Sequence, residues 1–330
     1  MKKIIIIAIL AIFLISMASG ANPVKVKEVR EKHEPELFAI EGVSGVSVDE
    51  ENNEIIVYIE KPEISKKVPK VLDGFHVRHK VIGRIEALQT ISAIEAPFAA
   101  YQTLTFSRTG SYNPVFGGIS VGNPYITAGT LGLVTNDGSG KPIILSNAHV
   151  LALNSQNKFL PLGTPIYQPG PYDGGNSLNK IGVLSKYIGI TFNSYRANNK
   201  ADAAIATLSI PGNKNEILNE TNDGFYIISG TTTVSVNDIV RKSGRTTGVT
   251  TGIVTDTAAS VKVSYGGKWA IFKDQIIVSN LNSIKFSDGG DSGSAVDKDG
   301  KFIGLLFAGS STTTVVNKAG NVLAPLGINV

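Results

Sequence analysis

Residues 287–296 have the sequence SDGGDSGSAV, in which glycine, aspartate and serine crowd together just before the chain turns apolar. A given four-letter word such as GDSG occurs by chance in under about 1% of chains of this length. The word suits a serine nucleophile, because the hydroxyl of Ser292 needs nearby backbone N–H groups that converge on the developing oxyanion. Gly290 lets the backbone turn there without a Cβ in the way. Taken alone, the GDSG motif is explained equally well by a plain surface turn.

A serine nucleophile needs a base, which is most often histidine. His149, in IILSNAHVLA, is the only histidine in residues 116–330, and it follows an apolar run that predicts a strand. The base in turn needs a carboxylate. Asp202, in NKADAAIATLSI, enters an apolar run, where a carboxylate without a partner is costly. Asp173, in QPGPYDGG, is the competitor, but its glycine-rich surroundings favour an exposed turn.

Composition excludes several other classes of function. The 31 basic and 27 acidic residues are spread along the chain without a basic block, so we expect no nucleic-acid partner. The absence of cysteine excludes disulfides, thiolate zinc sites and cysteine nucleophiles. No metal-ligand cluster appears in the sequence, and serine chemistry requires none, so we expect neither a metal nor a cofactor.

The N-terminus predicts export. Two lysines precede an apolar run from Ile4 to Met17, and small residues follow it. The run is shorter than the ~20 residues of a membrane span, and its flanks are those of a signal peptide, which we place at residues 1–21. We therefore expect a secreted or extracytoplasmic protein. An uncleaved anchor is the alternative, and membrane contact is expected only in that case.

The rest of the chain divides into two regions that differ in composition and sequence pattern. Residues 22–98 are rich in lysine and glutamate, and a strand, a turn and a strand followed by a short helix and another strand predict a small α/β domain. Residues 99–115 predict a linker. In residues 116–330, short β-branched runs recur at intervals of about ten residues, which is typical of an all-β barrel or sandwich. His76 and His79 are expected on opposite faces of a strand, as surface residues.

One family combines these features. His149 in SNAHV, Asp202 in ADAAIATL and Ser292 in GDSGS occur in the order of the trypsin-like (chymotrypsin-fold) serine peptidases, which residues 116–330 resemble. The resemblance is closest to the bacterial secreted alpha-lytic protease and streptogrisin branch. RKSGRTTGVTTGIV is similar to a segment of that branch, and PVFGGISV resembles the start of its mature domain. The implied fold is an all-β double barrel of two six-stranded antiparallel barrels, with the site in the cleft between them.

The resemblance implies a role for each residue of the site. Ser292 is the nucleophile that becomes acylated, His149 is the general base and then the acid, and Asp202 orients the histidine. The amides of Gly290 and Ser292 form the oxyanion hole.

Asp291 is expected to be buried behind the nucleophile and to hold the loop through an ion pair. The family's arginine partner is replaced by Lys242, with Arg241 and Arg245 close by, and lysine cannot form the bidentate fork of arginine. Ser294 replaces the second glycine of the family's GDSGG, a small change.

Two further positions depart from the family. Phe307 stands where a serine supports the aspartate of the triad, so Asp202 lacks one hydrogen bond or finds another. Phe286 stands where trypsin-type enzymes place an acid, so the specificity pocket, with Phe286 and Gly309, is expected to be small or apolar. Asp288 lies near enough to weaken this expectation.

The resemblance also implies a precursor. A pro-region in this branch assists folding and occupies the cleft, so we expect the N-terminal domain to contact the peptidase domain, with TFSRTGSYNP as an exposed processing segment. A permanent accessory domain is the alternative. The predicted function is a secreted serine endopeptidase that acts on protein or peptide substrates. The alternatives are a catalytically silent trypsin-like fold that acts as an extracellular binding module, and an esterase of small acyl esters.

Overall fold

The computed structural model of the chain describes residues 25–88, 105–126 and 128–330. The predicted signal peptide, residues 1–21, lies outside the described residues, as does the first part of the predicted linker. In the described ranges, no helix combines the length and the apolar character that a membrane crossing requires.

The C-terminal half of the chain forms a closed β-barrel. Its hydrogen-bonded order is β16-β19-β20-β21-β18-β17, and an antiparallel pairing of β16 with β17 closes the ring. The strands are β16 (Ile239–Gly244), β17 (Gly248–Ser264), β18 (Trp269–Asn280), β19 (Ala295–Lys298), β20 (Lys301–Gly309) and β21 (Thr313–Lys318). Alternating β-branched and polar residues give these strands their buried and exposed faces.

A second barrel precedes it in the chain. Its main sheet has the order β11-β12-β13-β10-β9-β22, and short strands β7 and β8 close the ring through an antiparallel bridge between Gly122 and Tyr167. The strands are β7 (Ser120–Val121), β8 (Gly129–Thr130), β9 (Leu133–Asp137), β10 (Pro142–Ser146), β11 (Pro165–Tyr167), β12 (Lys180–Tyr187), β13 (Ala204–Leu208) and the C-terminal β22 (Ile328–Asn329). The predicted double barrel is confirmed.

Smaller elements connect and cover the barrels. Helix α4 (Ala319–Leu326) buries its apolar residues against Leu145 of the first barrel and Leu305 of the second. A three-stranded sheet lies beside the first barrel and consists of β6 (Val115–Gly117), β14 (Gly212–Leu218) and β15 (Phe225–Ile227). The one-turn helix α3 (Ala148–Leu151) follows β10 directly and carries a site residue.

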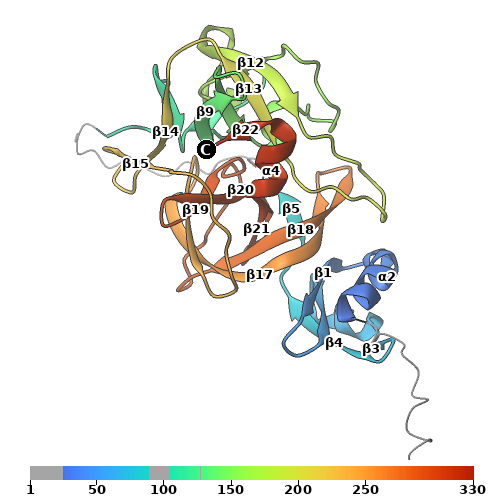
Figure 1. Cartoon of the computed structure of the whole chain (residues 1–330). Coiled ribbons are helices and arrows are strands. Elements are labelled where there is room, and N and C mark those ends of the chain that lie inside the picture. The colour runs from blue at the N-terminus through green and yellow to red at the C-terminus, as the bar shows by residue number, and fades with distance from the viewer. Residues whose placement is uncertain (1–24, 89–104, 127) are drawn as a thin grey trace, which may run out of the picture.

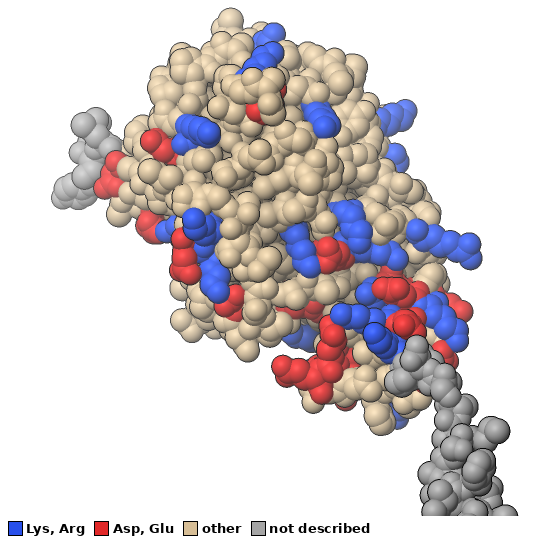
Figure 2. Space-filling model, in the orientation of Figure 1, with Lys and Arg blue, Asp and Glu red and all other residues tan. Residues whose placement is uncertain are grey.

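The N-terminal residues form the small α/β domain that the sequence predicts. The elements are α2 (Val26–Ala39), β1 (Val43–Asp49), β2 (Glu54–Ile59), the 3₁₀ helix η1 (Pro62–Lys67), β3 (Val71–Leu72), β4 (Phe75–Val81) and β5 (Ile85–Ala87). Sequence analysis missed α2, because charged residues fill VKEVREKHEPELFA and its apolar face is short. On the face that Figure 2 shows, charged side chains are crowded over this domain, whereas those on the barrels are scattered.

The N-terminal domain continues the sheet of the second barrel. β1 pairs antiparallel with β17, with Gly45 opposite Val261 and Val46 opposite Ser260, which produces one 11-stranded sheet (Figure 1). A Cβ on Gly45 would lie 2.8 Å from the carbonyl oxygen of Ser260, so only glycine permits this close approach.

Candidate active site

His149 and Asp202 are brought together by the pairing of two strands of the first barrel. β10 ends three residues before His149 and β13 begins two residues after Asp202, and the two strands pair with Ser146 opposite Ala204. His149 Nδ1 lies 2.6 Å from Asp202 Oδ2, and the backbone N–H of His149 donates to Oδ1 at 3.0 Å. Because the carboxylate can only accept from Nδ1, the neutral imidazole carries its proton there and leaves Nε2 as an acceptor.

Asp202 is completely buried and its carboxylate has a further partner. Tyr265 donates its hydroxyl to Asp202 Oδ2 at 2.7 Å. Burial favours a raised pKa, but the charge of His149 and the hydrogen bonds from His149 and Tyr265 outweigh it and hold the pKa of Asp202 below its ordinary value. Burial and the neighbouring carboxylate raise the pKa of Tyr265 well above its usual range, so it stays a hydrogen-bond donor.

Tyr265 is the site residue that sequence analysis missed. Phe307 cannot support Asp202 through its side chain, and Tyr265 supplies a hydrogen bond from the end of β17 instead. The residue lies 63 positions from Asp202 along the chain, in SYGGKW, and nothing in that segment indicates a catalytic role. The contact between Tyr265 and Asp202 can be recognised only in the folded structure.

Ser292 lies in the loop between β18 and β19, on the second barrel, and reaches the first barrel through Thr130. The N–H of Thr130 donates to the carbonyl oxygen of Ser292 at 2.7 Å, and the hydroxyl of Ser146 donates to the carbonyl oxygen of Thr130 at 2.7 Å. The hydroxyl of Ser292 donates to the carbonyl oxygen of Phe307 at 3.1 Å. Within the described residues, His149 Nε2 is buried without a hydrogen-bond partner, and Ser292 faces Phe307 instead.

One of the two predicted oxyanion amides contacts a carbonyl group. Gly290 has φ = +94°, a left-handed conformation that glycine adopts at little cost. Its N–H donates to the carbonyl oxygen of Leu88 at 2.9 Å. The N–H of Ser292 makes no such bond to the described residues.

The carboxylate of Asp291 is buried and is held mostly by the GRTTG segment. It accepts from the amides of Thr246 and Thr247 at 2.9 and 3.1 Å, and from the hydroxyl of Thr247 at 2.6 Å. It also accepts from the amide of Asp288 at 2.9 Å, which ties the loop to itself.

Lys242 lies behind this carboxylate. Its Nζ is 3.7 Å from Asp291 Oδ2, and both side chains are fully buried. Lys242 also donates to the carbonyl oxygen of Gly248 at 2.7 Å and to the hydroxyl of Thr247. Burial lowers the pKa of Lys242 to about 8, although the charge of Asp291 opposes the shift. The expected pair is present, with Thr247 between its members.

The structure corrects the expectation for Asp173. Its side chain is only 7% exposed, and Arg245 pairs with both of its carboxylate oxygens, while Ser120 donates to it at 2.5 Å. The glycine-rich turn is therefore built around an ion pair instead of being open to solvent. Arg241 is likewise engaged elsewhere, with Asp297.

The predicted pocket residues surround an apolar side chain. Phe286 is fully buried in an apolar cluster against which Leu88 packs. A Cβ on Gly309 would lie 3.4 Å from Leu88 Cδ1, so Leu88 lies directly beside this glycine. Asp288 is about half exposed and pairs with Lys285 at 2.7 Å, outside this cluster.

The segment TFSRTGSYNP is partly exposed, as the sequence predicts, and it is anchored to the barrels by some of its side chains. Phe106 and Tyr112 stack edge to face with ring centroids 5.6 Å apart. The guanidinium of Arg108 donates to Ser243 at 2.7 Å and to the carbonyl oxygens of Gly118 and Asn219 at 3.0 and 2.9 Å.

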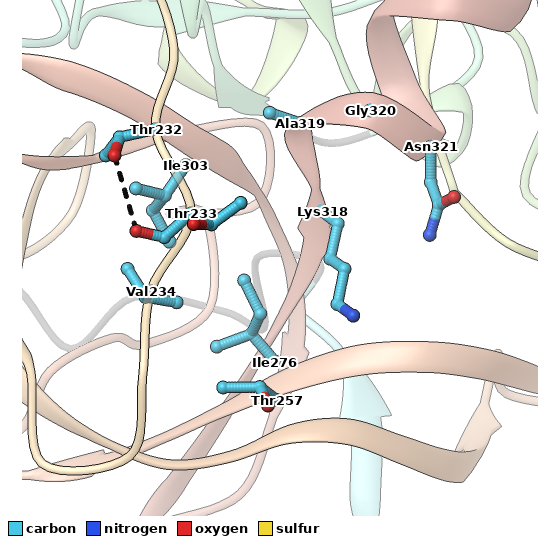
Figure 3. A pocket seen from close by; sticks show the side chains of 10 residues that line it. All are labelled: Thr232, Thr233, Val234, Thr257, Ile276, Ile303, Lys318, Ala319, Gly320 and Asn321. Atoms are coloured by element: carbon cyan, nitrogen blue, oxygen red, sulfur yellow. Dashed lines mark hydrogen bonds between the residues drawn. The ribbon is translucent and has the colours of Figure 1, made fainter.

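Two other features lie outside the site. A hollow of about 300 Å³ is lined by Thr232, Ile276, Lys318 and neighbouring residues, and it includes none of the predicted site residues (Figure 3). Over the residues that the structure describes, no group of three or more metal-ligating side chains comes together. His76 is exposed on β4, whereas His79 is half-buried rather than on the surface.

No family model matches the chain, and no curated protein matches it in sequence. Among solved structures, the chain is similar to Nocardiopsis protease, with 18% identity and a TM-score of 0.47 over 66% of this chain and 98% of that one. It is also similar to Thermobifida fusca protease A, with 16% identity and a TM-score of 0.48 over 66% and 97% of the two chains. It is similar as well to a glutamic acid-specific serine protease, with 20% identity and a TM-score of 0.47 over 66% of this chain and 100% of that one. At these identities and TM-scores, the similarity by itself assigns no activity to this chain.

Proposed function

We propose that the protein is a serine endopeptidase that forms an acyl-enzyme on Ser292. The observation that carries the proposal is the buried pair of His149 and Asp202. Its geometry leaves Nε2 as a free acceptor at the cleft where the loop of Ser292 reaches the first barrel. A histidine that is fixed by a carboxylate on one nitrogen and free on the other is the arrangement of a general base.

Each group has a defined task in this reaction. Ser292 turns its hydroxyl from Phe307 to His149, transfers the proton to Nε2 and attacks the carbonyl carbon of the substrate. Asp202 holds the imidazole in the required tautomer and stabilises its positive charge. The Gly290 amide donates to the oxyanion, where a preorganised donor is worth about 10²–10³-fold in rate. The imidazolium then protonates the leaving amine.

The substrate is a polypeptide rather than a simple ester. Strand β20 pairs with an extended segment of backbone, Ile85–Ala87, through main-chain hydrogen bonds, and this edge leads to Ser292. Addition of a strand to a sheet edge is a common mode of peptide recognition. A small acyl ester has no backbone with which to use this edge.

The N-terminal domain acts as a pro-region, and the protein is exported as a precursor. Support comes from the signal-like sequence of residues 1–21 and from the pairing of β5 with β20 beside Ser292. A catalytically silent binding module is the second candidate, favoured only by the hydroxyl of Ser292 facing Phe307.

A fluorophosphonate probe tests the proposal directly. Wild type should gain one adduct, located at Ser292 by peptide mass mapping, and Ser292→Ala should gain none. Ser311→Ala, at an exposed serine, is the matched control and should be labelled like wild type. Unchanged labelling of Ser292→Ala would contradict the proposed peptidase function. So would the absence of labelling in folded wild type that has lost residues 26–88.

A further inference from the structure

A piece of the N-terminal domain lies against the second barrel, beside Ser292, as an extended strand. Residues 85–87 pair antiparallel with β20, with Ala87 opposite Ala308 and Glu86 opposite Gly309. On the other side, Ile85 pairs in parallel with Val263 of β17. The cyan strand β5 accordingly lies among the orange and red strands of the second barrel (Figure 1).

Leu88 follows this strand and ends at the nucleophile. Its N–H donates to the carbonyl oxygen of Phe307 at 3.3 Å, and its carbonyl oxygen accepts from the amide of Gly290 at 2.9 Å. The hydroxyl of Ser292 donates to the same carbonyl oxygen of Phe307, at 3.1 Å. The carbonyl group of Leu88 is therefore adjacent to Ser292 and already polarised by the oxyanion amide.

The side chain of Leu88 fills an apolar environment. It packs against the cluster that contains Phe286, and it lies beside Gly309, where any side chain would meet it. Asp288, the more exposed of the two acids in the loop that carries Ser292, is paired with Lys285. A leucine is therefore well accommodated at this half-buried position, whereas a charged side chain would be placed against apolar neighbours.

We propose that the chain cleaves itself, within one molecule, at the peptide bond on the carboxyl side of Leu88, and that leucine is a preferred residue at this position of any substrate. The inference rests on the proposed peptidase function and adds the bond and the side chain. The partly exposed segment TFSRTGSYNP is a poorer candidate, because Arg108 anchors it to the barrel surface. The amide of Gly290 bonds to the carbonyl oxygen of Leu88 and to no residue of that segment.

The reaction balances without a co-reactant other than water. Ser292 Oγ bonds to the carbonyl carbon of Leu88 and its proton passes to His149 Nε2. The C–N bond after Leu88 breaks, and the same proton goes to the departing amine. Water then attacks the ester, giving one proton to His149 and its hydroxyl to Leu88. The bond between Ser292 Oγ and the carbonyl carbon breaks, and His149 returns the proton to Oγ. The products are a chain that ends in the carboxylate of Leu88 and a chain that begins at residue 89.

Intact mass of the full chain over time tests this bond. Wild type should yield the two masses of a cut after Leu88, at a half-time that is unchanged by tenfold dilution, and Ser292→Ala should remain whole. Leu88→Asp should slow this cut at least about 100-fold, because a charge replaces an apolar side chain that packs against the Phe286 cluster. Leu88→Met should retain it, and Leu178→Asp, at an exposed leucine, is the matched control.

Hydrolysis of peptide anilides by wild type tests the leucine preference without any substituted chain, so that the folding of variants does not affect the result. Wild type should hydrolyse Ile-Glu-Ala-Leu-p-nitroanilide at least about 100-fold faster than Ile-Glu-Ala-Asp-p-nitroanilide. Labelling of Ser292 by fluorophosphonate together with a first cut elsewhere, or with a rate proportional to concentration, would overturn this inference and leave the peptidase intact. Absence of both labelling and cutting would reject the proposed function itself. A cut after Leu88 that persists in Ser292→Ala would also overturn the inference.

Discussion

The two barrels contribute to the site in different ways. The first barrel holds His149 and Asp202 in place by the direct pairing of β10 with β13, within a fully buried network. The second barrel carries Ser292 on a loop, and the N-terminal domain enlarges its sheet to eleven strands. Among the described residues, every strand pairing that residues 26–88 make with the barrels is to β17 or β20.

Under the proposed function, this difference separates chemistry from access. The pair of His149 and Asp202 is preorganised, whereas β5 and Leu88 of the N-terminal domain lie against β20 and Gly290 beside Ser292. Changes in the first barrel should therefore affect the chemical step, and changes at β17 should affect access to the site. The following predictions test this division.

The largest effect is expected for Asp202→Asn. An amide at this position favours the wrong tautomer of His149, so kcat should fall about 10⁴-fold, as in the Ser-His-Asp template. Hydrolysis of the leucine anilide measures the loss. Asp173→Asn removes the competing carboxylate and breaks its buried pair with Arg245, which costs roughly 3–5 kcal/mol of stability. It leaves the imidazole of His149 in place, so kcat of the folded variant should change little. Equal losses in the two variants would contradict the assignment of Asp202.

Release of the N-terminal domain should follow from Glu34→Ala. Glu34 is 1% exposed and bonds to Ser260 at 2.9 Å and to Lys273 at 2.7 Å, across the interface with the second barrel. Removal of one partner of a buried pair costs roughly 3–5 kcal/mol, so hydrogen exchange in β1 should accelerate by at least about 100-fold. The measurement is made in the Ser292→Ala background. Glu36→Ala, at an exposed position of the same helix, should leave exchange unchanged.

Lys242 should make stability depend on pH. Its native pKa of about 8 lies below the ordinary 10.5, so between these values the unfolded state retains a proton that the native state has lost. The free energy of unfolding therefore rises with pH across this window, by up to about 3 kcal/mol. Urea unfolding of Ser292→Ala from pH 7.5 to 10.5 measures the rise. Adding Lys242→Met should remove this contribution, and an identical slope in both proteins would refute it.

The smallest effect is expected for Tyr265→Phe. Loss of one hydrogen bond to the carboxylate of Asp202 should lower kcat about tenfold with little change in KM, because hydrogen bonds to charged groups contribute about 1.5–3 kcal/mol. The acid limb of the profile of kcat against pH should also move. Tyr195→Phe, at a surface tyrosine, is the control. A change confined to thermal stability would show that Tyr265 only supports the fold.

The β-branched runs between turns were enough to predict the barrels, which the structure confirms. His149, Asp202 and Ser292 could be singled out as site candidates because each stands in a short, chemically distinctive segment, and the structure brings His149 and Asp202 together. Tyr265 and Glu34 could not be found, because their roles depend on contacts across 63 and 226 residues. Leu88 is an ordinary leucine in the sequence, and only the register of β5 against β20 places it at Ser292.

The length of β17 has a consequence for the protein after processing. Near its C-terminal end, β17 pairs with β18 on one side and with β1 and β5 on the other, through Ser260, Val261, Val263 and Ser264. Departure of residues 26–88 would leave these backbone groups as an open sheet edge, which is a template for another strand. The processed protein would then expose an unpaired edge of β17. Two processed molecules could pair through this edge at high concentration.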